Sequence, residues 1–192
     1  MRNKMITMKD FIPENDPLLR EQADLVEFPL NDETRELALE MRQFLINSQD
    51  EEIAEKYGLR AGVGVAAPQL GIKKQMFAVY LMDYDEDGNP TEPIIDEVFI
   101  NAVIVKHAVL KVALKEGEGC LSVPREVPGV VARPKRVTLK YYNLEGEEQE
   151  IRLSDYEAIV VQHEMDHLKG ILFYDHINNE KPWVADDDTS LI

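Results

Sequence analysis

Residues 162–168 read Gln-His-Glu-Met-Asp-His-Leu and combine two histidines, four positions apart, with a glutamate directly after the first. On an α-helix, side chains four positions apart lie one turn apart on the same face, so His163 and His167 can reach one metal ion. Glu164 would then point toward the water that such an ion carries. This spacing indicates a metal-assisted hydrolase.

The surrounding sequence predicts the helix that this spacing needs. Ser154 and Glu157 stand at the spacing of a capping box, in which a hydroxyl accepts from a backbone N–H and the glutamate reaches back. Gly170 suits the left-handed conformation that commonly follows a helix end. Apolar residues share the face of the first histidine, so we expect the ligands to emerge from an apolar wall. The alternative is a pair of surface histidines with solvated acids between them.

Two histidines leave a catalytic metal one protein ligand short, because such sites usually hold three ligands and keep one position for water. Peptidases of this kind place the third ligand downstream, but Phe173 stands where a histidine is needed, and Glu180 is the only glutamate after the motif. Upstream, Cys120 is the only cysteine and lies between a glycine and a polar turn. A lone cysteine is usually a buried apolar residue, but the histidine pair favours a metal thiolate here.

A third segment, residues 62–69, reads Gly-Val-Gly-Val-Ala-Ala-Pro-Gln and carries no bulky polar side chain before Gln69. Such a run of small residues lets another part of the chain approach the backbone closely. It does not fit a dinucleotide-binding fingerprint, because the third glycine would fall at Ala67. Alone, the segment would indicate only a tightly packed turn.

Together the three segments closely resemble the peptide deformylase family, hydrolases that remove the formyl group from the starting methionine of new bacterial proteins. The family's motifs are a glycine-alanine segment ending in glutamine, then Glu-Gly-Cys-Leu-Ser, then Gln-His-Glu-x-Asp-His-Leu. They stand without a mismatch at residues 62–69, 118–122 and 162–168. The resemblance also runs over residues 123–178, which are similar to the longer, Gram-positive type, and it covers roughly the last two thirds of the chain.

The resemblance assigns the catalytic machinery to residues of these motifs: the metal ligands Cys120, His163 and His167, the general acid/base Glu164, and the oxyanion donors Gln69 and the backbone N–H of Leu121. Attack of water on a formamide builds negative charge on oxygen, and each preorganised donor to that oxygen is worth a factor of ~100 to 1000 in rate. A metal lowers the pKa of its water toward ~7. One carboxyl group can take the proton and return it to the departing amine.

The identity of the metal and the outer contacts follow mainly from the resemblance. One thiolate and two imidazoles suit zinc and ferrous iron alike. The resemblance favours Fe2+ in the cell, with Zn2+, Ni2+ or Co2+ as substitutes, and a ferrous thiolate site would be oxygen-sensitive. By analogy Asp166 pairs with Arg133 and holds the Cys120 segment against the helix, the alternative being a solvated acid and base. Glu118 is expected to orient the glycine-alanine segment.

The implied substrate is an N-formylmethionyl nascent peptide, which offers a small formyl cap, a methionine side chain and backbone of any sequence. Such a peptide could add as a strand beside Val63 and Gly64, where main-chain hydrogen bonds would give sequence-independent affinity. The methionine would enter an apolar pocket, for which Val63, Ile159, Val160 and His163 are the candidates. Core packing alone explains Ile159 and Val160 at least as well.

Length and composition predict that residues 1–192 form one compact domain, because a chain with 44% hydrophobic residues can bury a sizeable core without splitting. The resemblance implies that this is a single catalytic domain. There is no apolar run near ~18 residues and no basic leader, and a single cysteine suits a reducing compartment, so a cytoplasmic protein is expected. The net charge of -16 argues against direct binding to nucleic acid or an anionic membrane. Any ribosome association is therefore expected to be weak.

Hydrophobic periodicity predicts an amphipathic helix over residues 32–48 and a second short helix that ends near Gly58. The inner face of the first helix carries Leu37, Met41, Phe44 and Leu45. Strands are predicted before the motif helix, over residues 75–82, 98–105, 109–114, 137–142 and 148–153. This order predicts an α+β fold with antiparallel β-sheets packed around a central metal-binding helix and with an N-terminal helix.

Two other classes of function remain open on the sequence. A metallopeptidase could use the same helix to cut internal amide bonds, and it would take its third ligand from the C-terminal side instead of from Cys120. A binding module could hold a structural metal or none, and Glu164 would then have no role.

Overall fold

The computed structural model describes residues 4–192, which form three α-helices and two β-sheets. The helices are α1 (Asp32–Gln49), α2 (Glu51–Tyr57) and α3 (Asp155–His167), with short 3-10 turns at Met8–Asp10, Pro17–Arg20, Ala67–Leu70 and Phe173–His176. The strands are β1 (Gly64–Ala66), β2 (Met76–Tyr84), β3 (Pro90–His107), β4 (Lys111–Ala113), β5 (Arg133–Pro134), β6 (Arg136–Tyr142), β7 (Glu148–Ser154) and β8 (Thr189–Leu191). None of the helices within residues 4–192 has the length and apolar character needed to cross a bilayer.

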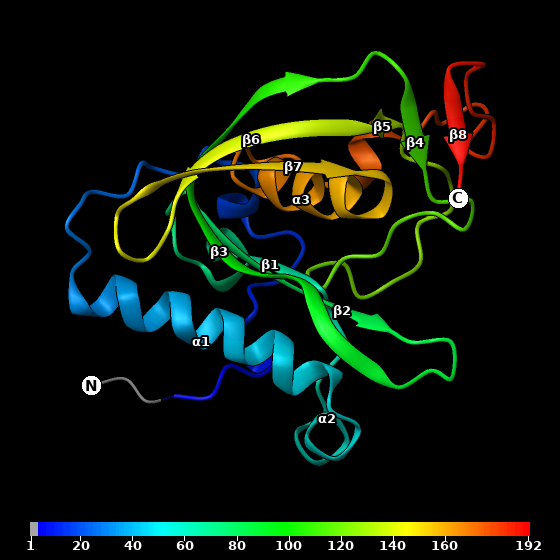
Figure 1. Cartoon of the computed structure of the whole chain (residues 1–192). Helices are drawn as coiled ribbons and strands as arrows, with labels where there is room; N and C mark the ends of the chain where they lie inside the picture. Colours follow the sequence, from blue (N-terminus) through cyan, green and yellow to red (C-terminus); the bar gives the residue numbers. More distant parts are fainter. Residues whose placement is uncertain (1–3) are drawn as a thin grey trace.

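The larger sheet is antiparallel, in the order β1-β2-β3-β6-β7, and it separates two hydrophobic clusters. Successive side chains of a strand point to opposite faces. Phe77 and Val79 of β2 therefore pack in the cluster that includes α3, whereas Met76 and Ala78 pack in the cluster that includes α1. Figure 1 shows α1 outside the sheet and α3 enclosed on its other side.

Helix α1 forms where the periodicity predicts it. Its first turn is capped by the side chain of Asn31, which accepts from the backbone N–H of Thr34 at 2.8 Å. The predicted inner face is confirmed, because all four of its side chains are buried against the sheet: Leu37, Met41, Phe44 and Leu45.

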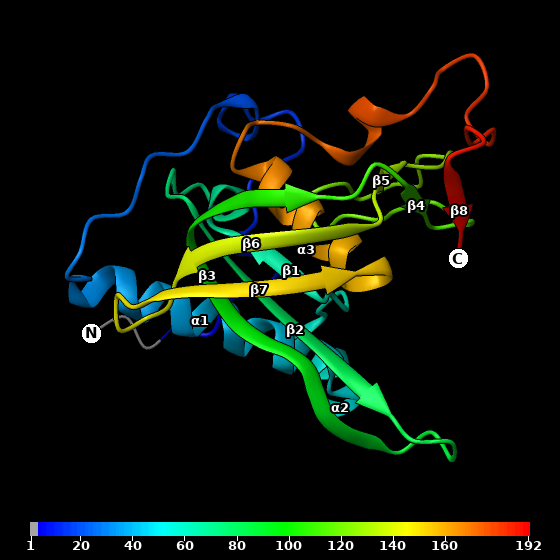
Figure 2. The same ribbon diagram turned by 45° about the horizontal axis from the view of Figure 1, so that its top comes forward.

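The strand β3 lets the sheet bend around α3, and it is much longer than the predicted run. Its first part pairs with β2 and its second part with β6, with register shifts between Ile100 and Val103 and between Ile104 and Lys106. At the bend Asn101 has a φ of 51°, a left-handed conformation that asparagine tolerates better than most residues. Figure 2 shows the curved course of β3 and its long hairpin with β2.

The smaller sheet has the order β5-β4-β8 and lies beside the N-terminal part of α3. Strand β4 pairs antiparallel with β5 and parallel with β8, which brings the C-terminal segment alongside the chain that leads to Cys120. The three strands that the sequence does not reveal, β1, β5 and β8, have two or three residues each, too few to display an alternating pattern.

The capping box predicted at Ser154 is wrong. Ser154 is the N-cap residue of α3, but its side chain makes no capping hydrogen bond, because Ser154 is also the last residue of β7 and pairs with Arg136. Asp155 takes a φ of 53° and donates its backbone N–H to the Lys135 carbonyl at 2.8 Å. Strand pairing, instead of a side-chain cap, thus fixes where the helix begins. After the helix, Gly170 has the predicted left-handed conformation, with a φ of 70°.

Candidate active site

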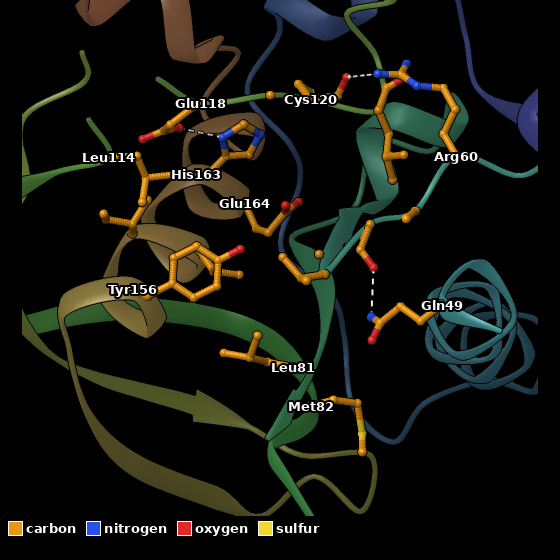
Figure 3. Close-up of a pocket in the computed structure, with 18 of the residues that line it drawn as sticks. Gln49, Arg60, Leu81, Met82, Leu114, Glu118, Cys120, Tyr156, His163 and Glu164 are labelled. Carbon is orange, nitrogen blue, oxygen red and sulfur yellow. Dashed lines mark hydrogen bonds and ion pairs between the residues drawn. The ribbon is translucent and has the colours of Figure 1, made fainter. Parts of the chain in front are cut away.

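A cavity of about 430 Å³ lies between the start of β1, the middle of α3 and the loop that carries Cys120. Figure 3 shows His163 and Glu164 on the helix side and the Cys120 loop facing them. The sequence motifs, which are far apart in the chain, therefore meet at one cavity. Gln69 lines this cavity too, directly after β1.

The ligand atoms of Cys120, His163 and His167 all lie within 4.8 Å of one another. The Cys120 Sγ is 3.3 Å from the His167 Nε2. Three donors that each bind one ion at ~2.0 to 2.3 Å lie at most about 4.6 Å apart, so these residues fit a single metal with only a small adjustment. The His163 Nδ1 makes a hydrogen bond with the Glu118 Oε2 at 2.8 Å, which leaves the Nε2 of the ring for a metal.

A buried ionic network supports these residues. Arg133 donates to both carboxylate oxygens of Glu118, at 2.7 and 3.0 Å, and to the Asp166 Oδ2 at 2.8 Å. The predicted pairing of Asp166 with Arg133 is confirmed. His176, from the 3-10 turn after α3, also bonds the Asp166 Oδ2, at 2.8 Å.

The expectation that Glu118 orients the glycine-alanine segment is wrong. Its carboxylate faces His163 and Arg133 instead, because a buried anion needs donors, and these two side chains supply them. Burial would raise the pKa of Glu118, but the hydrogen bond with His163 and the charge of Arg133 hold it below its usual value. Glu118 thus stays anionic and fixes the orientation of the His163 ring.

Glu164 has a different environment, although it is also buried. Burial raises the pKa of its carboxyl group to about 7. Its Oε2 has no hydrogen-bond partner within residues 4–192, and the side chain points into the cavity. A carboxyl group with such a pKa can hold or release a proton near neutral pH.

Gly64 of β1 and Gly62, two residues before it, permit close packing at the cavity. A Cβ on Gly64 would lie 2.5 Å from the Glu164 Oε1, and a Cβ on Gly62 would lie 2.8 Å from the Leu121 Cδ1. Both distances are too short for real contacts, so any side chain at these positions would displace the groups that face them. The small residues of the motif therefore admit Glu164 and Leu121 to the site.

Gln69 is held in one orientation by its own neighbours. Its Oε1 accepts from the backbone N–H of Ala66 at 2.8 Å, and its Nε2 donates to the Ser122 Oγ at 3.0 Å and approaches the Cys120 Sγ at 3.5 Å. The backbone N–H of Leu121 makes no hydrogen bond within residues 4–192. Two groups that can donate to a substrate oxygen are therefore placed beside the cysteine.

The predicted substrate-binding residues all line the cavity: Val63, Gly64, Ile159 and Val160. Ile159 and Val160 are buried and also form part of the cavity wall. Within residues 4–192, strand β1 is at the edge of its sheet, so one side of it is not paired with another strand.

Sequence reasoning missed several cavity residues, including Arg60, Leu114 and Tyr156. Tyr156 was open to inference, because it lies one helical turn before Val160 and therefore on the same face of α3. Arg60 and Leu114 carry no such signal, since they lie outside regular elements that reach the site.

The sequence model of the polypeptide deformylase family matches residues 8–183. The chain belongs to this family. The match begins well before the first motif, so it extends beyond the last two thirds of the chain that the motifs alone reveal. Deformylases of this family are metal-dependent enzymes, and the Cys120, His163 and His167 cluster is suited to a metal ion.

Curated deformylases of lactic acid bacteria are similar over nearly the whole chain. The peptide deformylase of Lactiplantibacillus plantarum is 55% identical over 188 residues, which are 98% of this chain and 100% of that protein. The peptide deformylase of Latilactobacillus sakei subsp. sakei is 56% identical with the same coverage. These relatives confirm the predicted enzyme and agree with the Gram-positive type.

Solved deformylase structures share the fold. The peptide deformylase from Ehrlichia chaffeensis has a TM-score of 0.74 and 26% identity, covering 93% of this chain and 91% of that chain. The Met-Ala-Ser bound structure of the class I type b peptide deformylase from Acinetobacter baumannii has a TM-score of 0.70 and 29% identity, covering 91% of this chain and 100% of that chain. The predicted α+β fold class is thereby confirmed.

The contact between Gly64 and Glu164 predicts the effect of Gly64→Ala. The added methyl group would push the carboxylate out of place, so we expect the deformylase kcat to fall about 100-fold, within the range of a lost general acid/base. Stability should change little, because the displaced group faces a cavity. Gly88→Ala is the control: it lies in a distant turn with a φ of 81° and should lower stability by about 1 kcal/mol without affecting kcat. A fully active Gly64→Ala enzyme would contradict this packing.

The buried network predicts that Arg133→Met strongly destabilises the protein. It leaves Glu118 and Asp166 without their cation, so urea denaturation should show a loss of about 3 to 5 kcal/mol. Arg42→Met is the control, because the ion pair of Arg42 with Asp96 is partly exposed and should be worth less than ~1 kcal/mol. Equal losses in the two variants would mean that the network does not carry this stability.

Proposed function

We propose that the whole chain, residues 1–192, is one catalytic domain that removes the N-formyl group from the N-terminal formylmethionine of newly synthesised proteins and releases formate. Membership of the deformylase family supports the reaction. The observation that carries the assignment to this site is the convergence of Cys120, His163 and His167 beside the buried carboxyl group of Glu164.

Cys120, His163 and His167 would hold one divalent ion, Fe2+ in the cell by resemblance to the family, with Zn2+, Ni2+ or Co2+ as substitutes. One sulfur and two ring nitrogens accept all of these ions. When bound, the metal supplies Lewis-acid chemistry and lowers the pKa of water near the site. Glu118 keeps the ring of His163 oriented for this role.

Glu164 is the general acid/base of the proposed reaction. Its carboxylate accepts a proton from the attacking water, and the same carboxyl group then donates this proton to the amine of the departing methionine. The pKa of about 7 suits both steps, because neither protonation state is strongly favoured near neutral pH. One residue therefore serves both halves of the hydrolysis.

Gln69 and the backbone N–H of Leu121 donate to the oxygen that becomes negative when water attacks the formyl carbon. One N–H of the Gln69 amide donates to the Ser122 Oγ, and the second contacts the Cys120 Sγ at 3.5 Å, a weak acceptor that a substrate oxygen can replace. The orientation of the amide is fixed before substrate binds, because Ala66 holds the amide oxygen. Donors that need no reorganisation are the ones that accelerate such reactions most.

The nascent peptide would lie as an added strand along the free side of β1, next to Val63 and Gly64. The Met-Ala-Ser bound state of the Acinetobacter baumannii relative supports this class of ligand. The methionine side chain would enter the cavity between Val63, Ile159 and Val160, near His163. Main-chain recognition would explain how one enzyme accepts proteins of any sequence.

The proposed binding partners and substrates of the enzyme are N-formylmethionyl nascent peptides. We therefore place the enzyme in the cytoplasm, where such peptides are made. The net charge of -16 supports at most a weak ribosome association and no direct binding to nucleic acid or membrane. The two other functions lack support: a peptidase would not need the Cys120 sulfur beside His167, and a binding module would not need an unpaired buried carboxyl group at Glu164.

The Glu164→Ala variant tests the proposed reaction. Metal-loaded wild-type enzyme should release formate from formyl-Met-Ala-Ser, and Glu164→Ala should lower kcat by about 10² to 10⁴-fold while it keeps about one equivalent of metal. Elemental analysis checks the metal, and a formate assay checks the rate. Unchanged activity in this variant would favour a binding module in which Glu164 has no role.

The Cys120→Ala variant tests the third ligand. Without the sulfur, only two imidazoles remain, so we expect most of the metal and the activity to be lost after dialysis against a chelator that the wild-type enzyme withstands. A variant that retained both metal and activity would point to a ligand from the C-terminal side and to the metallopeptidase alternative.

A further inference from the structure

The guanidinium group of Arg60 lies at the rim of the cavity and donates to three backbone carbonyls of the Cys120 loop. It contacts the Leu121 oxygen at 3.1 Å, the Cys120 oxygen at 3.2 Å and the Val123 oxygen at 3.5 Å. Figure 3 shows Arg60 reaching the backbone next to Cys120. Within residues 4–192 this arginine makes no ion pair with a carboxylate, and all of its hydrogen bonds go to the loop.

The three carbonyls belong to one tight turn. The backbone N–H of Val123 donates to the Cys120 oxygen at 3.1 Å and closes it. The Cys120 carbonyl therefore accepts from both Val123 and Arg60. An arginine suits this task, because its planar fork can hold two or more oxygens in fixed directions, whereas a lysine is a single mobile point charge.

The Cys120 carbonyl and the Leu121 N–H belong to the same planar peptide group. A cation that binds this carbonyl fixes the plane of the group and therefore the direction of the N–H. It also withdraws electron density from the amide, which makes the N–H a stronger donor, since hydrogen bonds in a chain polarise one another. The Leu121 N–H has no other partner within residues 4–192.

We propose that Arg60 is a positioning residue for deformylation, which orients and polarises the Cys120–Leu121 peptide so that the Leu121 N–H can stabilise the oxyanion. This role rests on the proposed function, because it concerns the transition state of that reaction. Arg60 acts through the peptide group and does not touch the reacting atoms. Its contribution should therefore appear in kcat instead of KM, because the charge on the formyl oxygen develops only in the transition state.

The test compares metal-loaded wild-type enzyme with Arg60→Met, Arg60→Lys and Arg35→Met, using formyl-Met-Ala-Ser and a formate assay. Arg35 is the matched control, because it also donates to a backbone carbonyl, that of Leu144, at 2.7 Å, but it lies on α1 away from the cavity. We expect Arg60→Met to lower kcat about tenfold, a part of the factor that a whole oxyanion donor supplies, with KM within about twofold of wild type. The kcat of Arg60→Lys should lie between those of Arg60→Met and wild type, and the kcat of Arg35→Met should match that of wild type.

Two further readouts separate this role from a general loosening of the loop. The cobalt-loaded Arg60→Met enzyme should keep one equivalent of metal and the thiolate-to-metal absorption of wild type. In a fourth variant, Arg60→Ala, added guanidinium ion at millimolar concentration should restore part of the kcat, and it should not affect Arg35→Met. Should Arg60→Met fail to fold, Arg60→Lys carries the test with a smaller expected loss.

Several outcomes would overturn the inference. An increased KM with unchanged kcat would make Arg60 a substrate-binding residue, and a loss of metal in parallel with kcat would make it a support of the Cys120 ligand. Kinetics equal to wild type would show that the contact has no role. Formate release by the wild-type enzyme tests the proposed function separately: without it, the proposed function fails and this inference fails with it, whereas an active wild type with an equally active Arg60→Met refutes the inference alone.

Discussion

The rest of the site depends on the buried guanidinium group of Arg133. The side chains of Arg133 and Glu118 are 4% and 3% exposed, and Asp166 is 14% exposed. These residues come from β5, from the loop after β4 and from α3, so one cation joins three segments that are distant in the sequence. Removing one partner of such a network leaves an uncompensated charge in the interior, which is strongly unfavourable. Because Glu118 is two residues before Cys120 and also bonds His163, the network holds the thiol beside the helix that carries both histidines.

The same constraint divides the carboxyl groups of the site between two tasks. Burial would raise the pKa values of Glu118 and Asp166, but Arg133 holds both below their usual range. His163 assists at Glu118, and His176 assists at Asp166. Glu164 lies close by without a bonded cation, and burial raises its pKa to about 7. The carboxyl groups that have hydrogen-bond donors are thus fixed anions that orient the metal ligands. The carboxyl group without such donors can exchange a proton. The glycine at position 64 is part of this arrangement, because it leaves room for an unpaired carboxyl group.

Much of this architecture could be predicted from local patterns. The spacing of His163 and His167 is a property of a single helix, and the apolar face of α1 repeats along one element, so both are visible in the sequence. The pairing of Asp166 with Arg133 was predictable only by resemblance to a family, since nothing local connects the two residues. The actual partners of Glu118 were not predictable, because they depend on how three segments meet in the interior. Likewise, Arg60 has no sequence signal, since its contacts are with backbone carbonyls, which any residue could provide.

The start of α3 shows how tertiary structure overrides a local signal. Ser154 and Glu157 have the spacing of a capping box, but Ser154 is committed to pairing with Arg136 at the end of β7. Strand pairing satisfies the backbone there and sets the direction in which the helix leaves the sheet, which in turn directs the histidines toward Cys120.

X-ray absorption spectroscopy of the metal-loaded wild-type protein can show whether the Cys120 sulfur and two imidazole nitrogens bind the same metal ion. In the zinc-loaded protein, the coordination shell should contain one sulfur at about 2.3 Å and two histidine nitrogens at about 2.0 to 2.1 Å. A shell made only of nitrogen and oxygen, with no sulfur scatterer, would contradict this shared coordination.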